Sequence, residues 1–235
     1  MQAIGNLPPV AAAGRLPEEY FAEYLRQIVR PGDRILDAGC GSGKFVRDNF
    51  AKQAGCELVG VDIQETVAMN ENLDFRVRAS VTHLPFRNRS FNLVACRWTI
   101  EHVASPETAL SEFYRILKTG GRLAVFTPNL FHYYGAAARL TPHEFHVWFN
   151  RRVRGFDECD IFPTYYRANT RRRLRRLLVR SGFKRPDVTL IEGAPNALAF
   201  NPVLHRVGKL YQFCVGRFSF LSSFRMNLIA IAHKE

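Results

Sequence analysis

The sequence has little of what marks a secreted or membrane-spanning protein. Its five cysteines in 235 residues are scattered and form no Cys-x-x-Cys pair, which predicts free thiols in a reducing cytoplasm. No run of about 18 apolar residues occurs, so we expect no transmembrane helix. Residues 1–14 lack the basic start and long apolar stretch of a signal peptide. We therefore expect a cytoplasmic protein, with peripheral membrane contact as an open alternative.

Acidic residues are scarce in the later part of the chain, and the net charge is +12. Residues 1–128 are nearly balanced, with 15 Lys and Arg against 14 Asp and Glu. Residues 129–190 carry 13 against 5, and residues 191–235 carry 5 against 2. The excess indicates an anionic partner, such as a phosphate group, a membrane surface or a nucleic acid. A solvated surface is the alternative, above all for residues 171–176, where leucines recur among arginines at helical spacing.

Short apolar runs alternate with helical patterns up to residue 128, which predicts an α/β fold with a doubly wound, mostly parallel sheet. Two late strands with a loose connection predict an antiparallel hairpin at its edge. The expected strands are residues 34–37, 58–62, 75–79, 93–96, 123–126, 187–191 and 226–232. The expected helices are residues 17–30, 44–54, 65–73, 105–118 and 170–180, with weaker helical character over 203–224.

The length suits one large domain, and a hydrophobic fraction of 47% is enough for its core. We expect residues 1–235 to form a single domain with three parts. Residues 17–128 would be the half that binds a cofactor. Residues 129–168 are aromatic, basic and irregular, and would form an inserted cap over the substrate. Residues 169–235 would supply a C-terminal helix and the edge strands.

A glycine-rich loop, Asp37-Ala38-Gly39-Cys40-Gly41-Ser42-Gly43, follows the first expected strand. Glycine lets the backbone approach a ligand closely at the carboxyl ends of the strands. A phosphate-binding P-loop needs four residues before its Gly-Lys pair and then Ser or Thr. Here only three residues intervene, and Phe45 follows Lys44. A dinucleotide fingerprint also fits less well, because Lys44 replaces its third glycine.

S-adenosylmethionine suits this loop better than a phosphate ligand. Asp37 comes at the start of the loop, where its carboxylate can face the cationic methionine end of that cofactor. Asp62 ends the second expected strand, 19 residues after Gly43. A carboxylate there can accept hydrogen bonds from both ribose hydroxyls. A sulfonium ligand has no phosphates, so an acid beside the loop is tolerated.

Several motifs in the correct order over residues 31–128 support this interpretation. Together they resemble the motifs of class I S-adenosylmethionine-dependent methyltransferases, in the small-molecule branch that includes quinone-biosynthesis enzymes. One glycine loop alone would be a weak signal, whereas the ordered set is specific. The segments that carry the resemblance are residues 35–43, 59–63, 84–86, 90–94, 100–103 and 115–123.

The resemblance implies a seven-stranded, Rossmann-like sheet and assigns the cofactor site. The methionine side would contact the chain at Asp37, Gly39, Cys40, Gly41 and Gly43, with Arg97 near the methionine carboxylate. Ribose and adenine would lie against Asp62, Ile63, Ser80 and Val81. The sequence departs from the family pattern at Ser80, where many relatives carry an acid, and at Asn92, which replaces the usual acid after Phe91.

Methyl transfer needs the acceptor in line with the methyl group, and a hydroxyl acceptor also needs a base. The candidate bases are His102, just past the fourth expected strand, and His143 and His146 in the cap. His102 could instead be a structural histidine, and the other two could belong to an ordinary polar loop. His143 and His146 could bind a metal with Cys159 and Asp160, but the spacing matches no closed zinc pattern, so we expect none.

Aromatic and arginine side chains gather in the cap, where they suit stacking on an acceptor and pairing with an anion. Packing of the cap onto the sheet is the alternative for most of the aromatics. Residues 204–224 mix phenylalanines with basic residues, and could lie on a membrane, cover an apolar substrate or bury their apolar side internally. The candidate acceptor-binding residues are Tyr133, Trp148, Arg151, Tyr165 and Tyr166.

These features predict a methyltransferase that modifies an oxygen of a small, glycan-linked or lipid-linked acceptor, with an anionic acceptor left open. An RNA methyltransferase is a second hypothesis, suggested by the charge. Against it, no RNA-binding module is recognised, and residues 95–98 are unlike an Asn-Pro-Pro-Tyr tetrad. A non-catalytic module that binds the cofactor is a third hypothesis, but the intact loop and Asp62 argue against it.

Overall fold

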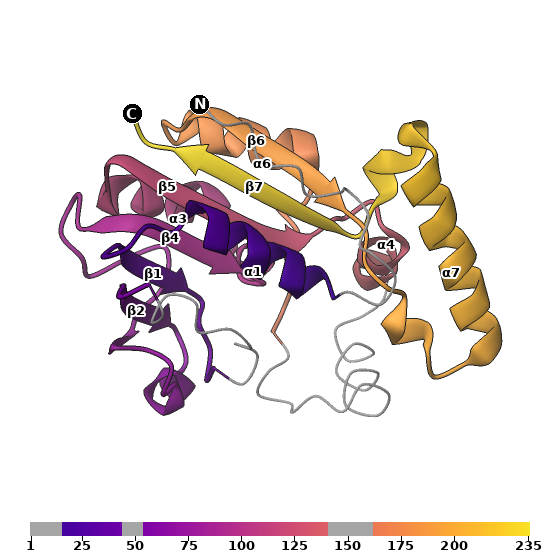
Figure 1. Cartoon of the computed structure of the whole chain (residues 1–235), viewed down its shortest axis with the longest axis horizontal. Helices are drawn as coiled ribbons and strands as arrows, with labels where there is room; N and C mark the ends of the chain where they lie inside the picture. Colours follow the sequence, from indigo (N-terminus) through magenta and orange to yellow (C-terminus); the bar gives the residue numbers. More distant parts are fainter. Residues whose placement is uncertain (1–15, 44–53, 141–161) are drawn as a thin grey trace.

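The computed structural model describes residues 16–43, 54–140 and 162–235 (Figure 1). Its centre is a seven-stranded sheet in the order β3-β2-β1-β4-β5-β7-β6. Neighbouring strands from β3 to β5 are parallel, whereas β7 is antiparallel to β5 and β6. This order confirms the predicted sheet and its antiparallel edge. The strands are β1 (Arg34–Ala38), β2 (Glu57–Asp62), β3 (Phe75–Arg78), β4 (Phe91–Arg97), β5 (Leu117–Pro128), β6 (Lys184–Ile191) and β7 (Asn227–His233).

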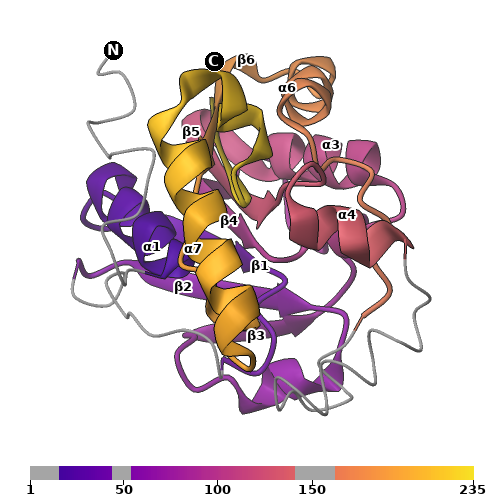
Figure 2. The same ribbon diagram turned by 90° about the vertical axis from the view of Figure 1, so that its right-hand side faces the viewer.

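Helices cover both faces of the sheet (Figure 2). On one face, α1 (Pro17–Ile28) buries Tyr20 and Phe21, and the Phe21 ring stacks on Phe126 of β5 with the centroids 5.3 Å apart. The other face is covered by α3 (Pro106–Ile116) and α6 (Arg171–Arg180), which pack into the larger core. The central strands are therefore buried on both sides, which explains their nearly continuous apolar runs.

The arginine run of α6 lies on the solvated face of a packed helix. The hydroxyl oxygen of Thr170 caps the helix by accepting a hydrogen bond from the backbone N–H of Arg173, at 3.3 Å. Leu174, Leu177 and Leu178 are buried, while all six arginines of the helix are exposed. The solvated surface that the sequence left open as an alternative therefore accounts for this run.

Two helices occur where the sequence indicated little regular structure. α4 (Tyr133–Leu140) follows β5, inside the region expected to be irregular. α7 (Pro202–Arg217) is a helix of 16 residues in the stretch with weak helical character. The side chain of Asn201 caps the first turn of α7 by accepting hydrogen bonds from two backbone N–H groups, and Pro202 follows. Capping and the proline favour a helix start that apolar spacing alone did not reveal.

The helix expected over residues 105–118 is shorter in the structure, because β5 already begins at Leu117. The backbone N–H of Gly120 donates to the carbonyl of Lys234 at 2.7 Å, which holds this segment at the end of the sheet. Ser105 does stand at the N-cap of α3, but its side chain makes no capping hydrogen bond. Pairing between distant segments therefore overrides the local helical pattern here.

The remaining helical segments of the described residues are short 3-10 helices. Residues 65–73 contain only η1 (Glu65–Met69) instead of a longer helix. The others are η2 (Ile100–His102), η4 (Asn196–Leu198) and η5 (Ser219–Phe224). Most of the helix expected over residues 44–54 falls outside the described residues. Within the described segments, no helix has the length and apolar character needed to cross a bilayer.

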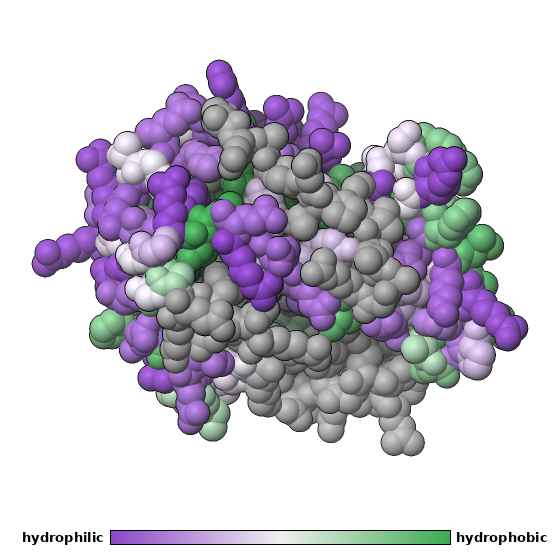
Figure 3. Space-filling model, viewed as in Figure 1, coloured by the Kyte–Doolittle hydropathy of each residue, from purple (hydrophilic) through white to green (hydrophobic). Residues whose placement is uncertain are grey.

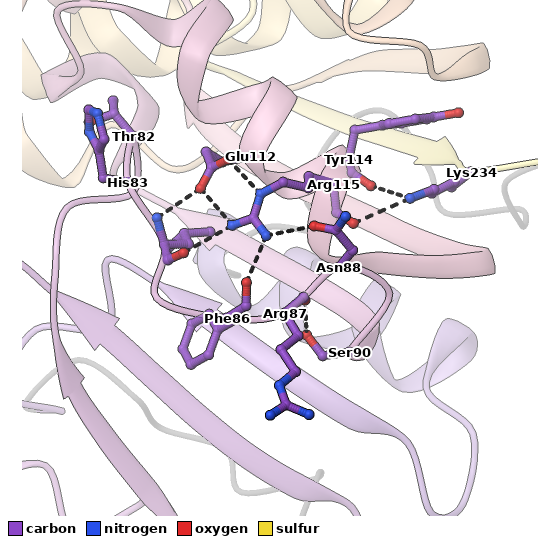
Figure 4. Close-up of polar contacts among 11 residues, drawn as sticks. Thr82, His83, Phe86, Arg87, Asn88, Ser90, Glu112, Tyr114, Arg115 and Lys234 are labelled. Atoms are coloured by element: carbon purple, nitrogen blue, oxygen red, sulfur yellow. Dashed lines mark hydrogen bonds and ion pairs between the residues drawn. The ribbon is translucent and has the colours of Figure 1, made fainter.

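Arg115 of α3 holds the segment that connects β3 to β4 (Figure 4). Its guanidinium donates to the carbonyls of Leu84 and Phe86, at 2.9 and 2.7 Å, and to the side-chain oxygen of Asn88 at 2.9 Å. It also pairs through two nitrogens with Glu112, whose carboxylate accepts the N–H of Leu84. One arginine therefore ties together two motifs that are far apart in the sequence.

Candidate functional site

The glycine loop leaves the carboxyl end of β1 with three glycines in the left-handed region. The φ angles of Gly39, Gly41 and Gly43 are +78°, +55° and +79°. A Cβ atom at residue 39 would lie 2.1 Å from the hydroxyl oxygen of Thr99, and one at residue 43 would lie 2.4 Å from the side-chain oxygen of Asn70. Glycine is therefore required at both positions by backbone conformation and by space.

The side chain of Asn70 supports the glycine loop through hydrogen bonds to its backbone. The sequence did not indicate Asn70 as a site residue. Its side chain is fully buried, and its amide donates to the carbonyls of Cys40 and Gly41 at 3.4 and 3.3 Å. Its oxygen accepts the N–H of Asn72 at 3.2 Å. The Cys40 side chain packs beneath the loop with Val67, and burial raises the pKa of its thiol. The loop is thus held by contacts that local sequence does not reveal.

Asp62, at the carboxyl end of β2, faces the same loop. One carboxylate oxygen accepts the N–H of Gly41 at 2.9 Å, and the other accepts the N–H of Gln64 at 3.0 Å. A carboxylate has about four lone-pair sites, so both oxygens keep the capacity to accept further hydrogen bonds. The side chain is only partly buried. This arrangement fits the predicted role of Asp62 toward a pair of hydroxyls.

Asp37 and Arg97 form the charged side of the loop. Burial raises the pKa of the Asp37 carboxyl; Arg97 opposes that shift, while the nearby Asp62 carboxylate adds to it. The register of β1 and β4 brings them together, because Ala38 pairs with Cys96, the residue before Arg97. A carboxylate beside a guanidinium matches the amine and carboxylate of a free amino-acid group. The donor set therefore fits a methionine moiety.

The residues expected near adenine lie at the ends of β2 and β3. Ile63 is 62% exposed, which leaves an apolar side chain available beside Asp62. The Ser80 hydroxyl lies 2.8 Å from that of Thr82, so it is already engaged in a turn. Val81 packs its side chain into the main core, and any ligand contact there would involve its backbone. Of these residues, Ile63 offers the clearest apolar contact.

Glu101 is a buried acid at the carboxyl end of the central strands, and no role was predicted for it. Its carboxylate accepts a hydrogen bond from the Thr127 hydroxyl at 2.9 Å, and the Asn169 amide donates to the same hydroxyl at 2.8 Å. Burial raises the pKa of Glu101 to about 7. Its backbone carbonyl accepts the N–H groups of Tyr165 and Tyr166, at 2.8 and 3.2 Å. Glu101 therefore links three segments that meet beside the site.

His102 follows Glu101 and is the only predicted base within the described residues. Its Nδ1 lies 3.0 Å from the carbonyl oxygen of Pro163, so Nδ1 carries the hydrogen and Nε2 is the acceptor nitrogen. Burial lowers the pKa of His102, which favours the neutral ring. Tyr165 is 48% exposed, and Arg167 lies over its ring at 5.6 Å. Burial raises the pKa of Tyr166.

Tyr133 is half-buried in a second aromatic group, beyond the carboxyl ends of β5 and β6. Its ring centroid lies 4.0 Å from that of His132 and 5.0 Å from that of Tyr211. Nε2 of His132 lies 3.8 Å from a carboxylate oxygen of Glu192, too far for a hydrogen bond. Burial lowers the pKa of His132 to about 3 and raises that of Glu192 to about 8. This group was not predicted as a unit.

Four predicted site residues lie outside the described residues: His143, His146, Trp148 and Arg151. Their roles remain predictions. Among the described residues, no group of three or more His, Cys, Asp or Glu side chains could hold a metal ion.

Comparisons with known proteins place this site in context. Residues 36–125 match a family model described as a methyltransferase domain. The chain is 38% identical over 127 residues to a demethylmenaquinone methyltransferase of Symbiobacterium thermophilum, a match that covers 48% of this chain and 49% of that protein. It is 32% identical over 118 residues to the sterol 24-C-methyltransferase of Schizosaccharomyces pombe, covering 46% and 31%. These matches thus span about half, or less, of the relatives' lengths.

The fold is also found in solved structures. A methyltransferase from Mesorhizobium loti, described as dependent on S-adenosylmethionine, aligns with a TM-score of 0.61 and 18% identity. That alignment covers 94% of this chain and 99% of the other. At this identity the likeness shows the fold alone.

Proposed function

We propose that this chain, whose residues 36–125 belong to the class I methyltransferase family, is an enzyme that transfers a methyl group from S-adenosylmethionine. The observation that carries the proposal is the glycine loop between two carboxylates. Three left-handed glycines let the backbone approach a ligand, Asp62 faces the same loop, and the Asp37 carboxylate at the start of the loop would repel a bound phosphate. A cationic ligand without phosphates fits that charge.

Each part of the cofactor has a matching group in this chain. Asp37 would pair with the amine of the methionine moiety and Arg97 with its carboxylate. Asp62 would accept the ribose hydroxyls, and the exposed Ile63 would cover adenine. When bound, the cofactor supplies a methyl group that the sulfonium makes electrophilic. The chain then has to exclude water and align the acceptor, which contributes through proximity and orientation.

We assign proton removal from a hydroxyl acceptor to His102. Its ring is neutral because burial lowers its pKa, and the hydrogen bond from Nδ1 to Pro163 leaves Nε2 as the accepting nitrogen. The acceptor hydroxyl would lose its proton to Nε2 as its oxygen takes the methyl group. Tyr133, Tyr165 and Tyr166 are our proposed acceptor contacts from the described part of the cap.

The proposed acceptor is a small molecule that is lipid- or glycan-linked and methylated at oxygen. Two relatives are named for demethylmenaquinone and for sterol, and both of those compounds are lipids. One of those names specifies a carbon atom, so carbon methylation is the second candidate. RNA remains the alternative suggested by the basic excess of the later half.

Two measurements test this function. Calorimetry of the purified chain with S-adenosylmethionine should show saturable binding. If neither calorimetry nor a displacement assay detects binding, the assignment of S-adenosylmethionine as the methyl donor is overturned. Incubation with a cofactor labelled in its methyl group, in the presence of a total lipid extract, should label a lipid. The carbon chemical shift of the transferred methyl distinguishes an O-methyl from a C-methyl product. Label in RNA instead of lipid would replace the proposed acceptor.

A further inference from the structure

α7 presents an apolar face to solvent. Val203, Val207, Leu210 and Phe213 recur every three or four residues, so they lie on one side of the helix. Their exposed fractions are 66%, 58%, 64% and 62%. Two phenylalanines of η5, which follows the helix, are also exposed. Figure 3 shows apolar residues gathered over α7 at the right of the view.

The opposite side of α7 is fixed to the rest of the protein. Gly208 and Val215 are buried, and a Cβ atom at residue 208 would lie 2.8 Å from Pro195. The Tyr211 hydroxyl donates to the carbonyl of Phe224 at 2.6 Å, and Arg225 donates to the carbonyl of Val215 at 3.2 Å. Because these contacts occupy the inner side, the exposed apolar side chains belong to a genuine outer face.

Basic side chains stand on the same outer face. Arg206, Lys209 and Arg217 are exposed, and residues 193–234 contain no Asp or Glu. α6 is different, because its six exposed arginines have buried leucines behind them and Val179 as the single exposed apolar residue of that helix. The basic charge of α6 is therefore ordinary surface charge. α7 combines cations with large apolar groups and lacks acids.

We propose that the outer face of α7 and η5 binds the surface of an anionic lipid bilayer. A helix that lies in the plane of a membrane buries apolar side chains among the headgroups and pairs its cations with lipid phosphates. The apolar side chains here are Val203, Val207, Leu210 and Phe213. The cations are Arg206, Lys209 and Arg217. The cations of this face, with no acid among residues 193–234, favour an anionic surface over a neutral protein partner.

The position of α7 relates this surface to the proposed cofactor site. The helix lies beyond the carboxyl ends of the parallel strands (Figures 1 and 2). The glycine loop follows the carboxyl end of β1, so it lies at the same edge of the sheet. If the proposed function holds, docking through α7 brings that edge to the membrane, where a lipid-linked acceptor would be found. Binding to lipid itself does not depend on methyl transfer.

Vesicle flotation with the full chain tests the proposal. The chain should float with phosphatidylcholine vesicles that contain phosphatidylglycerol, remain behind with phosphatidylcholine alone, and dissociate as salt is raised. Replacing the three cations together, by Arg206→Gln, Lys209→Gln and Arg217→Gln, should lower partitioning on the order of 100-fold. Leu210→Ser with Phe213→Ser should lower it at least about tenfold, since two apolar groups leave the interface.

A matched control comes from α6. Arg171→Gln, Arg172→Gln and Arg175→Gln together remove the same charge from exposed positions, and should change partitioning by about twofold or less. Circular dichroism confirms that each variant is folded. An equal loss in the α6 control, or equal flotation with neutral vesicles, overturns the proposal.

Two other occupants of this face are also outcomes of the test. A dimer in gel filtration that Phe213→Ser converts to a monomer, without vesicle binding, would assign the face to a second copy of the chain and overturn the proposal. An RNA shift lost in the α7 variants but not in the α6 control would assign it to nucleic acid. Cofactor binding is measured without vesicles, so its failure would overturn the proposed function and leave the lipid result standing.

Discussion

A Cβ atom at residue 39 would occupy the position of the Thr99 side chain, 2.1 Å from its hydroxyl oxygen. Thr99 cannot easily move aside, because this hydroxyl lies 3.1 Å from the carbonyl oxygen of Ala38 and 2.9 Å from that of Arg97. The start of the glycine loop is therefore locked against the residues that follow β4. Changes at Gly39 should be felt at both strands.

Gly39→Ala is expected to weaken cofactor binding and to destabilise the chain. The left-handed conformation at φ +78° costs a residue with a Cβ roughly 1–2 kcal/mol, and the contact with Thr99 adds to that cost. Urea unfolding gives the stability and calorimetry gives the affinity.

Gly32→Ala is the matched control, because Gly32 has φ +76° but a Cβ atom added there would meet nothing within 4 Å. It should show the conformational cost alone and leave cofactor affinity unchanged. Equal effects of the two substitutions would contradict the steric role of Thr99.

Asp62→Asn should weaken binding of S-adenosylmethionine by roughly 1–3 kcal/mol, the scale of hydrogen bonds to a charged group. Asparagine keeps one oxygen for the N–H of Gly41 or Gln64, so the loop should retain its shape. Glu107→Gln, at an exposed position in the first turn of α3, removes the same charge away from the loop and serves as the control. Unchanged affinity of the Asp62 variant in calorimetry would contradict the ribose assignment.

The parts of this site that could be predicted are those whose chemistry is local in the sequence. Gly39, Gly41 and Gly43 lie in one loop, and Asp62 directly ends a recognisable strand. Alternation of strands and helices was enough to predict the sheet, because each element buries its own apolar pattern. The antiparallel edge followed from two late strands without a helix of regular pattern between them.

The parts that could not be predicted depend on contacts between distant residues. Asn70 supports the loop from a turn 30 residues away from Cys40, and nothing in its surroundings marks it. Glu101 lies in a recognisable motif, but its burial depends on Thr127 and on the later Asn169, which are outside that motif. α7 was harder to predict because apolar residues lie on both of its sides: Val207 and Leu210 are exposed, whereas Val215 is buried.

His102→Asn separates a catalytic role of His102 from a structural one. The asparagine amide can still donate to the carbonyl of Pro163, so a purely structural role would be preserved. If Nε2 removes the acceptor proton, kcat should fall roughly 10²- to 10⁴-fold, while affinity for the cofactor stays the same. The measurement is the rate at which the labelled methyl group is transferred to the lipid acceptor. Full activity in the variant would show that His102 is not the base.

Glu101→Gln is expected to change how stability depends on pH. Burial raises the pKa of Glu101 to about 7, from the usual range near 4.5, so between these values the unfolded chain has lost the proton that the folded chain keeps. Raising the pH through this window therefore favours unfolding, by up to about 3 kcal/mol at about 1.4 kcal/mol per pKa unit. The glutamine variant does not ionise and should lack this loss.

Urea unfolding of both proteins at about pH 4.5 and about pH 8 measures the effect. The variant should gain stability relative to the parent as the pH rises, because glutamine still offers an oxygen to the Thr127 hydroxyl. Taking the difference between the two proteins cancels the contributions of His132 and Glu192, which titrate in both. Glu107→Gln, on the exposed first turn of α3, controls for loss of a carboxylate. A difference that is the same at both pH values would mean that Glu101 is ionised throughout the window, and that its hydrogen bond to Thr127 outweighs its burial.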